Sequence, residues 1–258
     1  MGFRGALNDT TAPGPSSLSP EATRDILLLL LAATSGYVDA VSYLGLGNVF
    51  TANMTGNTVL LGLDLGQARE LAALRSAVAL AGFVAGVALG SAIVERERER
   101  GLWPARVTVA CAIEGLVLLA FAIGGALARA TDARAVYLLI ALSAIAMGVQ
   151  SVAVRALGVA GVTTTYITGT WMSLASGLTL RLRPTRTAGT RGKQEVGPSR
   201  RVTLQAAVVG VYLLAAVAGG AAQSAWRLAA ILLPAAAVAL VVGIAALHLH
   251  HGGQRWVR

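Results

Sequence analysis

Ionisable residues inside apolar stretches are the first candidates for chemistry in this chain. Asp39 lies about fourteen residues into the first apolar run, and Glu114 lies well inside the fourth. An ionised carboxylate at mid-bilayer depth costs about 2.5–3.5 kcal/mol even on the lenient insertion scale, so intramembrane acids usually carry function. We expect Asp39 to couple protons to solute movement, or else to hold a structural hydrogen bond or ion pair. Arg155 is its candidate ion-pair partner, unless that side chain reaches the interface, and Glu114 is a candidate proton relay.

Uncharged amide and hydroxyl side chains form a second candidate group. The positive ends of two short helices beside them would suit an anionic or zwitterionic solute, whereas exposed backbone carbonyls there would suit a cation. Alternatively, these side chains only satisfy broken backbone, which lipid leaves without water. The candidate solute-binding residues are Asn53, Thr55, Asn57, Gln150, Thr164, Thr168 and Thr170.

The stretches that carry most of these residues repeat each other. Residues 149–178 align with residues 36–65 without gaps at an offset of 113, and ten of the 30 positions are identical. In both, Leu-Gly is followed ten residues later by Thr-Gly. We therefore expect two related halves that meet around one site.

Signals for other chemistry are weak. The single Cys111 lies in an apolar run, and the three histidines near the C-terminus have no carboxylate or thiol beside them, so no metal site is expected. No phosphate loop, His-Glu-x-x-His or Gly-x-Ser-x-Gly motif is present in the sequence. The net charge of +9 comes from basic residues between or beyond apolar runs rather than from a basic face with aromatics. We expect no enzyme, no cofactor and no nucleic-acid partner.

Composition predicts an all-α polytopic membrane protein. Hydrophobic residues make up 55% of the chain and charged residues 13%, and the mean hydropathy is +0.68. A spanning helix needs roughly 20 apolar residues. Apolar runs fall at about 25–46, 49–66, 75–94, 106–128, 135–158, 162–180, 203–223 and 227–248.

The second and sixth runs predict re-entrant or broken helices. N-caps at Asn57 or Thr58 and at Thr168 or Thr170 would leave helices of about 12 and 16 Å, too short to cross a bilayer. The remaining six spans would form two inverted halves of three. Six spans with the N-terminus inside place 16 of the 21 basic residues in the cytoplasm, and eight spans place 15, so the positive-inside rule accepts either.

The predicted organisation has four parts. Residues 1–24 form a disordered polar tail, 25–130 the first membrane repeat, 131–248 the second with a cytoplasmic loop at 181–201, and 249–258 a C-terminal tail. In the third run, Gly82, Gly86 and Gly90 share one helix face and predict close packing against a neighbour.

Two stretches also carry a family resemblance. Residues 36–62, GYVDAVSYLGLGNVFTANMTGNTVLLG, and 147–170, MGVQSVAVRALGVAGVTTTYITGT, resemble the YoaK family of bacterial integral membrane proteins, a domain-of-unknown-function family. The resemblance implies a multi-pass protein of the bacterial inner membrane and points towards small-molecule transport, without naming a substrate.

The sequence therefore predicts a secondary transporter or facilitator of a small solute, with the site where the two broken helices meet. The alternative is a non-transporting membrane scaffold or sensor partner. The expected partners are the lipid bilayer and a small-molecule or ion substrate, and a homodimer is compatible with the sequence. The N-terminus is expected in the cytoplasm.

Overall fold

The computed structural model describes residues 18–95, 101–127, 133–182 and 198–250. The described part is helical and contains no strand, as the composition predicts. The elements in chain order are α1 (Pro20–Gly45), α2 (Met54–Gly66), α3 (Glu70–Val94), α4 (Ala105–Leu127), α5 (Ala133–Ala156), α6 (Ile167–Leu182), α7 (Pro198–Trp226), η1 (Arg227–Ile231), α8 (Leu232–Ile244) and η2 (Ala245–His250).

Six of the described helices are long and apolar enough to span a bilayer, which confirms the predicted number. They are α1, α3, α4, α5, α7 and α8 extended into η2. The other two, α2 with 13 residues and α6 with 16, reach only ~20 and ~24 Å at 1.5 Å per residue. These two are the short helices expected from the sequence.

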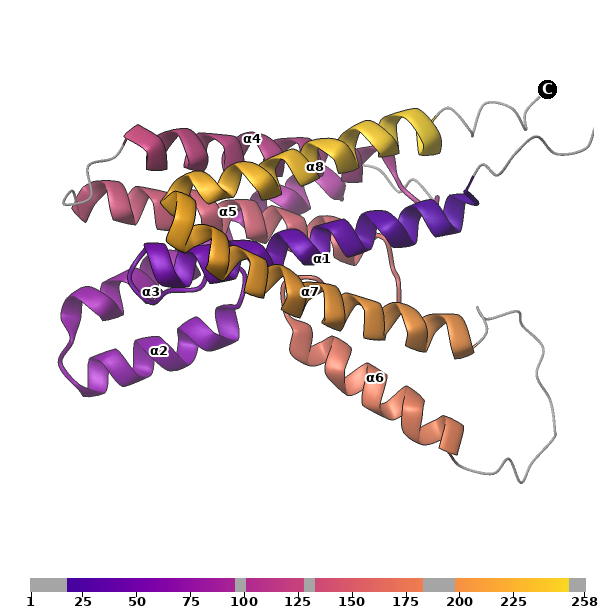
Figure 1. The fold of residues 1–258 in the computed structure, drawn as a ribbon, viewed down its shortest axis with the longest axis horizontal. Coiled ribbons are helices and arrows are strands. Elements are labelled where there is room, and N and C mark those ends of the chain that lie inside the picture. The colour runs from indigo at the N-terminus through magenta and orange to yellow at the C-terminus, as the bar shows by residue number, and fades with distance from the viewer. Residues whose placement is uncertain (1–17, 96–100, 128–132, 183–197, 251–258) are drawn as a thin grey trace, which may run out of the picture.

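The chain re-enters the bundle twice, from opposite ends. In Figure 1, α1 runs from the right-hand end of the bundle to the left. The chain then turns back into the bundle, and α2 leads it out again to the left-hand end, where α1 finished. The course of α5, the following loop and α6 is the same but runs in the opposite direction. We call residues 46–66 the first re-entrant element and residues 157–182 the second.

The two halves exchange their third helices. In the described bundle α3 packs mainly on α5, and α7 packs mainly on α1. Gly82, Gly86 and Gly90 of α3 lie against the backbone of α5, where a Cβ at Gly86 would collide with the carbonyl oxygen of Ile145. The predicted close-packing face is therefore confirmed, and its partner belongs to the other half of the chain.

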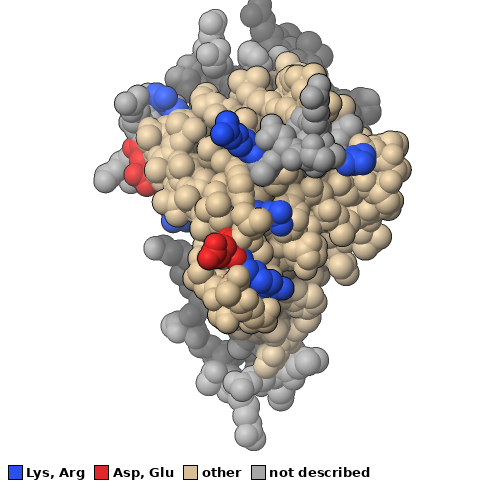
Figure 2. Space-filling model, turned by 90° about the vertical axis from the view of Figure 1, so that its left-hand side faces the viewer, with Lys and Arg blue, Asp and Glu red and all other residues tan. Residues whose placement is uncertain are grey.

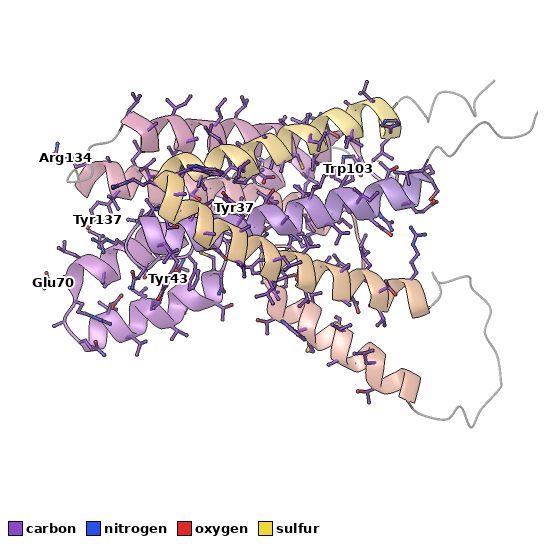
Figure 3. The ribbon with its side chains drawn as sticks, viewed as in Figure 1. Tyr37, Tyr43, Glu70, Trp103, Arg134 and Tyr137 are labelled. Carbon is purple, nitrogen blue, oxygen red and sulfur yellow. The ribbon has the colours of Figure 1, made fainter. Side chains whose placement is uncertain are left out.

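The same close approach recurs where α1 meets α7. A Cβ on Gly36 would collide with the carbonyl oxygen of Tyr212, and one on Gly219 would lie 2.7 Å from the carbonyl oxygen of Tyr37. Figure 3 shows Tyr37 at this crossing of α1 and α7. α1 of the first half is thus packed as closely on α7 of the second half as α3 is on α5.

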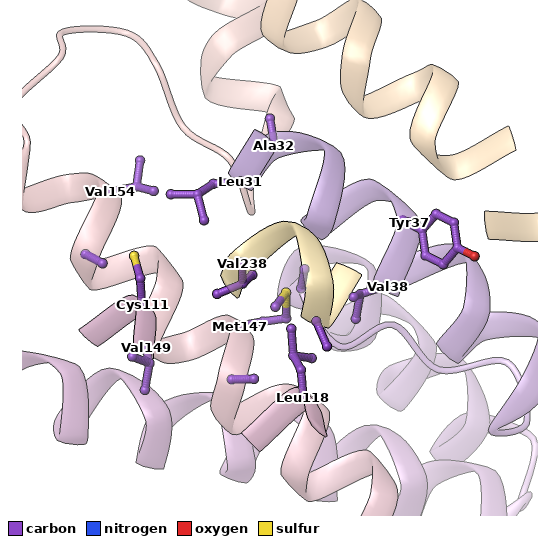
Figure 4. Packing of buried hydrophobic residues seen from close by; sticks show 14 of the residues in the cluster. Leu31, Ala32, Tyr37, Val38, Cys111, Leu118, Met147, Val149, Val154 and Val238 are labelled. Atoms are coloured by element: carbon purple, nitrogen blue, oxygen red, sulfur yellow. The ribbon is translucent and has the colours of Figure 1, made fainter. Parts of the chain in front are cut away.

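A buried apolar core joins the halves behind the crossings. Leu118 of α4, Met147 of α5 and Val238 of α8 are fully buried within it, and Figure 4 shows them converging with Val38 of α1. α4 of the first half packs on both α5 and α8 of the second half, so this core is shared by the two halves.

Several predicted boundaries need correction. α1 begins at Pro20, with the hydroxyl of Ser19 accepting from the Ala22 N–H at 3.2 Å, so residues 20–24 are helical and not part of a tail. α6 runs to Leu182 and α7 starts at Pro198, so the 181–201 loop is shorter than expected. Residues 1–17 and 251–258, which hold most of the predicted tails, lie outside the described residues.

The start of α2 is also corrected. Asn53, not Asn57 or Thr58, is the N-cap, because its Oδ1 accepts the Gly56 N–H at 3.1 Å. α6 likewise begins at Ile167, ahead of Thr168 and Thr170. Both helices are therefore longer than predicted by about a turn, but still too short to cross a bilayer.

Candidate functional site

Thr51 lies at the centre of a buried hydroxyl cluster where the first re-entrant element enters the bundle. Its Oγ1 shares a hydrogen bond of 3.0 Å with Ser42 of α1 and accepts one of 2.9 Å from Ser143 of α5. All three side chains are fully buried. This Thr51 cluster joins the first re-entrant element to a helix of the second half.

Gln150 of α5 forms the matching cluster for the second re-entrant element. Its Nε2 lies 2.9 Å from Thr164 Oγ1, 2.8 Å from Ser35 Oγ and 2.9 Å from the Leu31 carbonyl oxygen. The side chain is fully buried, and its Oε1 has no partner among the described residues. The Gln150 cluster therefore joins the second re-entrant element to α1 and keeps one acceptor open.

The two clusters define the geometry of the halves. Ser35 and Ser42 are seven residues apart on α1, and Ser143 and Gln150 are seven apart on α5, so each pair lies on one helix face about 10 Å apart along the axis. The higher-numbered residue of α1 meets the lower-numbered residue of α5. α1 and α5 are therefore antiparallel, and the repeats are inverted.

Asp39 fastens the first re-entrant element. Its Oδ1 accepts the N–H groups of Thr51, Ala52 and Asn53 at 3.0, 2.7 and 3.3 Å. Its Oδ2 accepts the hydroxyl of Tyr212 of α7 at 2.8 Å. Successive N–H groups aimed at one point form an anion-binding concavity, so the carboxylate supplies the partners that lipid cannot.

Asn57 and Thr170 hold equivalent places in the two halves. The Asn57 side chain accepts the Phe50 N–H at 3.0 Å and donates to the Phe50 carbonyl at 2.6 Å. Thr170 does the same for Thr163, at 3.1 and 3.2 Å. Both pairs match at the offset of 113. Because these side chains close their own loops, their polar groups are occupied by backbone.

A pair of arginines repeats the same symmetry at the ends of α1 and α5. Arg75 of α3 donates to the Gly47 carbonyl at 3.4 Å, and Arg201 of α7 donates to the Ala160 carbonyl at 3.1 Å. Residues 47 and 160 again differ by 113. Each loop is thus tied to the helix that follows its re-entrant element.

The structure does not bring Asp39 and Arg155 together. Both oxygens of Asp39 are occupied by the donors described above, and Arg155 is exposed at the end of α5. Glu114 is fully buried on α4, and neither of its oxygens has a partner among the described residues. Since α4 does not pack on α1, a direct relay between Glu114 and Asp39 has no contact to support it.

The remaining predicted residues divide by exposure. Thr164 and Gln150 belong to the buried Gln150 cluster, whereas Thr55 and Thr168, which are equivalent in the repeat, are exposed. Asn53 is half-buried and caps α2. Sequence reasoning missed the buried residues Ser35, Ser42, Thr51, Ser143 and Tyr212, although the identity of Thr51 and Thr164 in the repeat was a signal for one of them.

Two cavities flank the re-entrant elements. One of about 260 Å³, the Arg155 cavity, lies between the end of α5 and the start of α6 and is lined by Arg155, Ser151 and residues 158–166, among others. The other, the Asp64 cavity of about 460 Å³, is lined by Asp64 of α2 and by Arg69 and Arg75 at the start of α3. Asp64 and Arg69 form a 2.7 Å ion pair there.

The Asp64 cavity belongs to the end of the bundle where α2 meets α3. Figure 2 views this end and shows basic and acidic groups scattered among uncharged residues. Figure 3 shows that Glu70, at the start of α3, and Arg134 lie at this end, with Trp103 displaced towards the other. The two cavities therefore lie towards opposite ends of the bundle, each beside one re-entrant element.

Comparison with known proteins places the chain among membrane proteins. A family model described as protein of unknown function (DUF1275) matches residues 27–245. The chain is similar to the UPF0700 transmembrane protein YoaK of Bacillus subtilis (strain 168), with 43% identity over 165 residues, which cover 64% of this chain and 72% of that relative. No solved structure matches the chain significantly.

Proposed function

Because the chain belongs to the DUF1275 family of proteins of unknown function, we propose its activity from the site itself. It is a secondary transporter or facilitator that moves a small polar solute across the bacterial inner membrane. The solute passes between the Thr51 and Gln150 clusters, which hold the two re-entrant elements to one face of α5. The protein acts by binding and releasing the solute, not by chemical conversion.

One observation supports this function most strongly: each inverted half sends a short helix into the bundle, and both elements are bonded to the same face of α5. Thr51 is held by Ser143 and Thr164 by Gln150. Interrupted helices at the interface of inverted repeats are how many secondary transporters form a solute site at the bilayer midplane. Non-helical backbone at that depth is tolerated only in protein or beside water.

The cavities suggest how access alternates. The Asp64 cavity lies beside the first element and the Arg155 cavity beside the second. Opening the Gln150 cluster would connect the centre to the Arg155 cavity, and opening the Thr51 cluster would connect it to the Asp64 cavity. Because the clusters are separate sets of hydrogen bonds, one can open while the other stays closed.

Proton coupling, if transport uses it, is assigned to Glu114. Both oxygens of Asp39 are occupied by hydrogen-bond donors, four in all, whereas the Glu114 oxygens are buried and have no partner in the described part of the chain. An uncompensated charge there is costly, so Glu114 is the carboxyl that a proton would neutralise. It lies on α4, which packs directly on α5.

The proposed orientation places the N-terminus in the cytoplasm. With six spans and two re-entrant elements, 16 of the 21 basic residues lie on the side of the N-terminus and five on the other. Positively charged loops favour the cytoplasm.

Flux into proteoliposomes tests the function. A hyperosmotic pulse of each solute, followed by light scattering, reports whether vesicles with protein recover volume faster than empty ones. Thr164→Val should abolish recovery because it removes the bond to Gln150, whereas Thr168→Val, four residues on and exposed, should leave it intact. If both variants match the wild type for every transported solute, the central site is wrong.

The alternative is a non-transporting scaffold or sensor partner, and one observation favours it. Asp39, Asn57 and Thr170 bond to the backbone of the re-entrant loops, which stabilises a static bundle. A scaffold would give no flux for any solute and would co-purify with a partner protein in stable proportion.

A further inference from the structure

The Arg155 cavity has a different chemical character from its counterpart. In the cavity of the first half, Asp64 stands beside Arg69 and Arg75, so charges of both signs are present and partly paired. Among the described residues that line the Arg155 cavity, Arg155 carries the one positive charge and no residue is acidic. The inverted halves therefore present one mixed and one purely cationic cavity.

Arg155 has no ion pair or hydrogen bond among the described residues, in contrast to the arginines around it. Arg201 donates to the Ala160 carbonyl, and Arg200 pairs with Asp25 at 2.8 Å. The position equivalent to Arg155 in the first half is Ser42, which is buried in the Thr51 cluster. An arginine at this point is therefore not required to build a re-entrant half.

We propose that the Arg155 cavity binds the carboxylate of a small monocarboxylate, with the Arg155 guanidinium as its counter-charge. This assignment rests on the proposed function and names the class of solute that reaches the central site. The planar fork of a guanidinium matches a carboxylate in a two-bond arrangement. A single unpaired cation balances a single negative charge.

The rest of the lining fits such a solute. Ser151 and Thr165 share a hydrogen bond at the wall of the cavity, and Thr163 adds a further hydroxyl. Ser151 donates to the Met147 carbonyl and Thr163 to the Tyr166 carbonyl, so these hydroxyls would turn from backbone acceptors to a bound carboxylate. Val154, Val159 and Val162 form an apolar wall for a short hydrocarbon part. The cavity volume of about 260 Å³ lies just below the ~300 Å³ at which pockets for drug-sized ligands begin, which suits a small solute.

The cavity also leads to the central site. Thr164 lines it and at the same time bonds to Gln150, whose Oε1 is buried and without a partner among the described residues. A solute hydroxyl that displaced Thr164 would find that acceptor open. The second re-entrant element is thus both the wall of the carboxylate site and the gate to the centre.

Thermal unfolding of the full-length purified protein in detergent tests the proposal. The probes are sodium propionate, sodium chloride and sodium phosphate at matched ionic strength and pH. We expect propionate to raise the Tm of the wild type in a saturable way and chloride not to. Arg155→Gln should weaken the apparent propionate affinity by about tenfold or more, because a charged bidentate partner is lost, and Arg155→Lys should retain part of it.

A matched arginine control separates this cavity from its counterpart. Arg75→Gln alters the Asp64 cavity and should leave the propionate shift unchanged. If Arg155→Gln does not give folded protein, Arg155→Lys and Ser151→Ala carry the test, each with an expected loss of part of the shift.

Three outcomes overturn the proposal: no propionate shift in the wild type, an equal shift in Arg155→Gln, or a phosphate shift that depends on Arg155 and exceeds that of propionate. None of these affects the proposed transport function, which stands or falls on flux of any solute in proteoliposomes. Conversely, a propionate shift without flux would leave a binding site in a non-transporting protein.

Discussion

Ser143 donates a 2.9 Å hydrogen bond to Thr51 across 92 residues of sequence. It connects α5, the first helix of the second half, to the broken backbone of the first half. Ser42 bonds to the same oxygen, so Thr51 links α1 to α5 at a fully buried point. The halves are therefore joined by polar groups as well as by apolar packing.

Ser143→Ala should lower the free energy of unfolding in detergent by about 0.6 kcal/mol, and at most by about 1.7, which is the range for single hydrogen bonds between membrane helices. Thr51→Val should cost more, because Ser42 and Ser143 both lose a buried partner. Thr179→Ala is the control, since that exposed hydroxyl bonds only within its own helix. Equal effects at Thr51 and Thr179 would contradict the role of the cluster.

Asp39→Asn should destabilise the protein by about 1.5–3 kcal/mol, because the three N–H groups of residues 51–53 lose a charged acceptor. Asp39→Leu should cost more, since it leaves those groups unpaired. Tyr212→Phe removes one bond and should cost least. Thermal unfolding of the three purified variants gives the order. If Asp39→Asn is as stable as the wild type and changes only the pH dependence of flux, proton coupling belongs to Asp39 and not to Glu114.

Gly36→Ala should destabilise by about 1–3 kcal/mol, because a Cβ there collides with the backbone of α7 and the interface is close-packed. Gly210→Ala is the matched control on α7, with no atom within 4 Å of the added Cβ, and it should be neutral or gain up to about 1 kcal/mol of helix propensity. Unfolding in detergent compares the two. Similar losses at both sites would show that the α1–α7 crossing is looser than described.

Single cysteines should distinguish re-entrance from full crossing. With the buried Cys111 replaced by Ala, Asn48→Cys and Gln67→Cys are expected to react with a membrane-impermeant thiol reagent from one side of the membrane. Gly101→Cys should react from the other side. Eight full spans would instead put positions 48 and 101 on one side and position 67 on the other, and that pattern would remove the re-entrant elements.

Much of this architecture could be predicted from local properties of the chain. The length and apolarity of each run determine whether it can cross a bilayer, so the six spans and the two short helices follow from the sequence. The offset of 113 likewise identified two halves, and the equivalence of Asn57 with Thr170 and of Thr51 with Thr164 follows from it. These features depend on residues that are neighbours in the chain.

The partners of the polar residues could not be predicted in this way. Asn53 and Asn57 have the same propensity to cap a helix, but the turn of the chain brings only Asn57 within reach of Phe50. Asp39 and Arg155 are charged residues near the ends of two related helices, yet the carboxylate meets backbone N–H groups 12 to 14 residues further on and Tyr212 of α7.

The sequence by itself thus determined how many helices are long enough to cross the membrane, that two further helices are too short and that the chain has two halves, because hydrophobic length and repetition can be measured along the chain. Only the tertiary structure decided that α3 packs on α5 and α7 on α1, and that Ser143 and Gln150 hold one re-entrant element each. Those contacts depend on which helix faces come together across the two halves, and no local pattern specifies that approach.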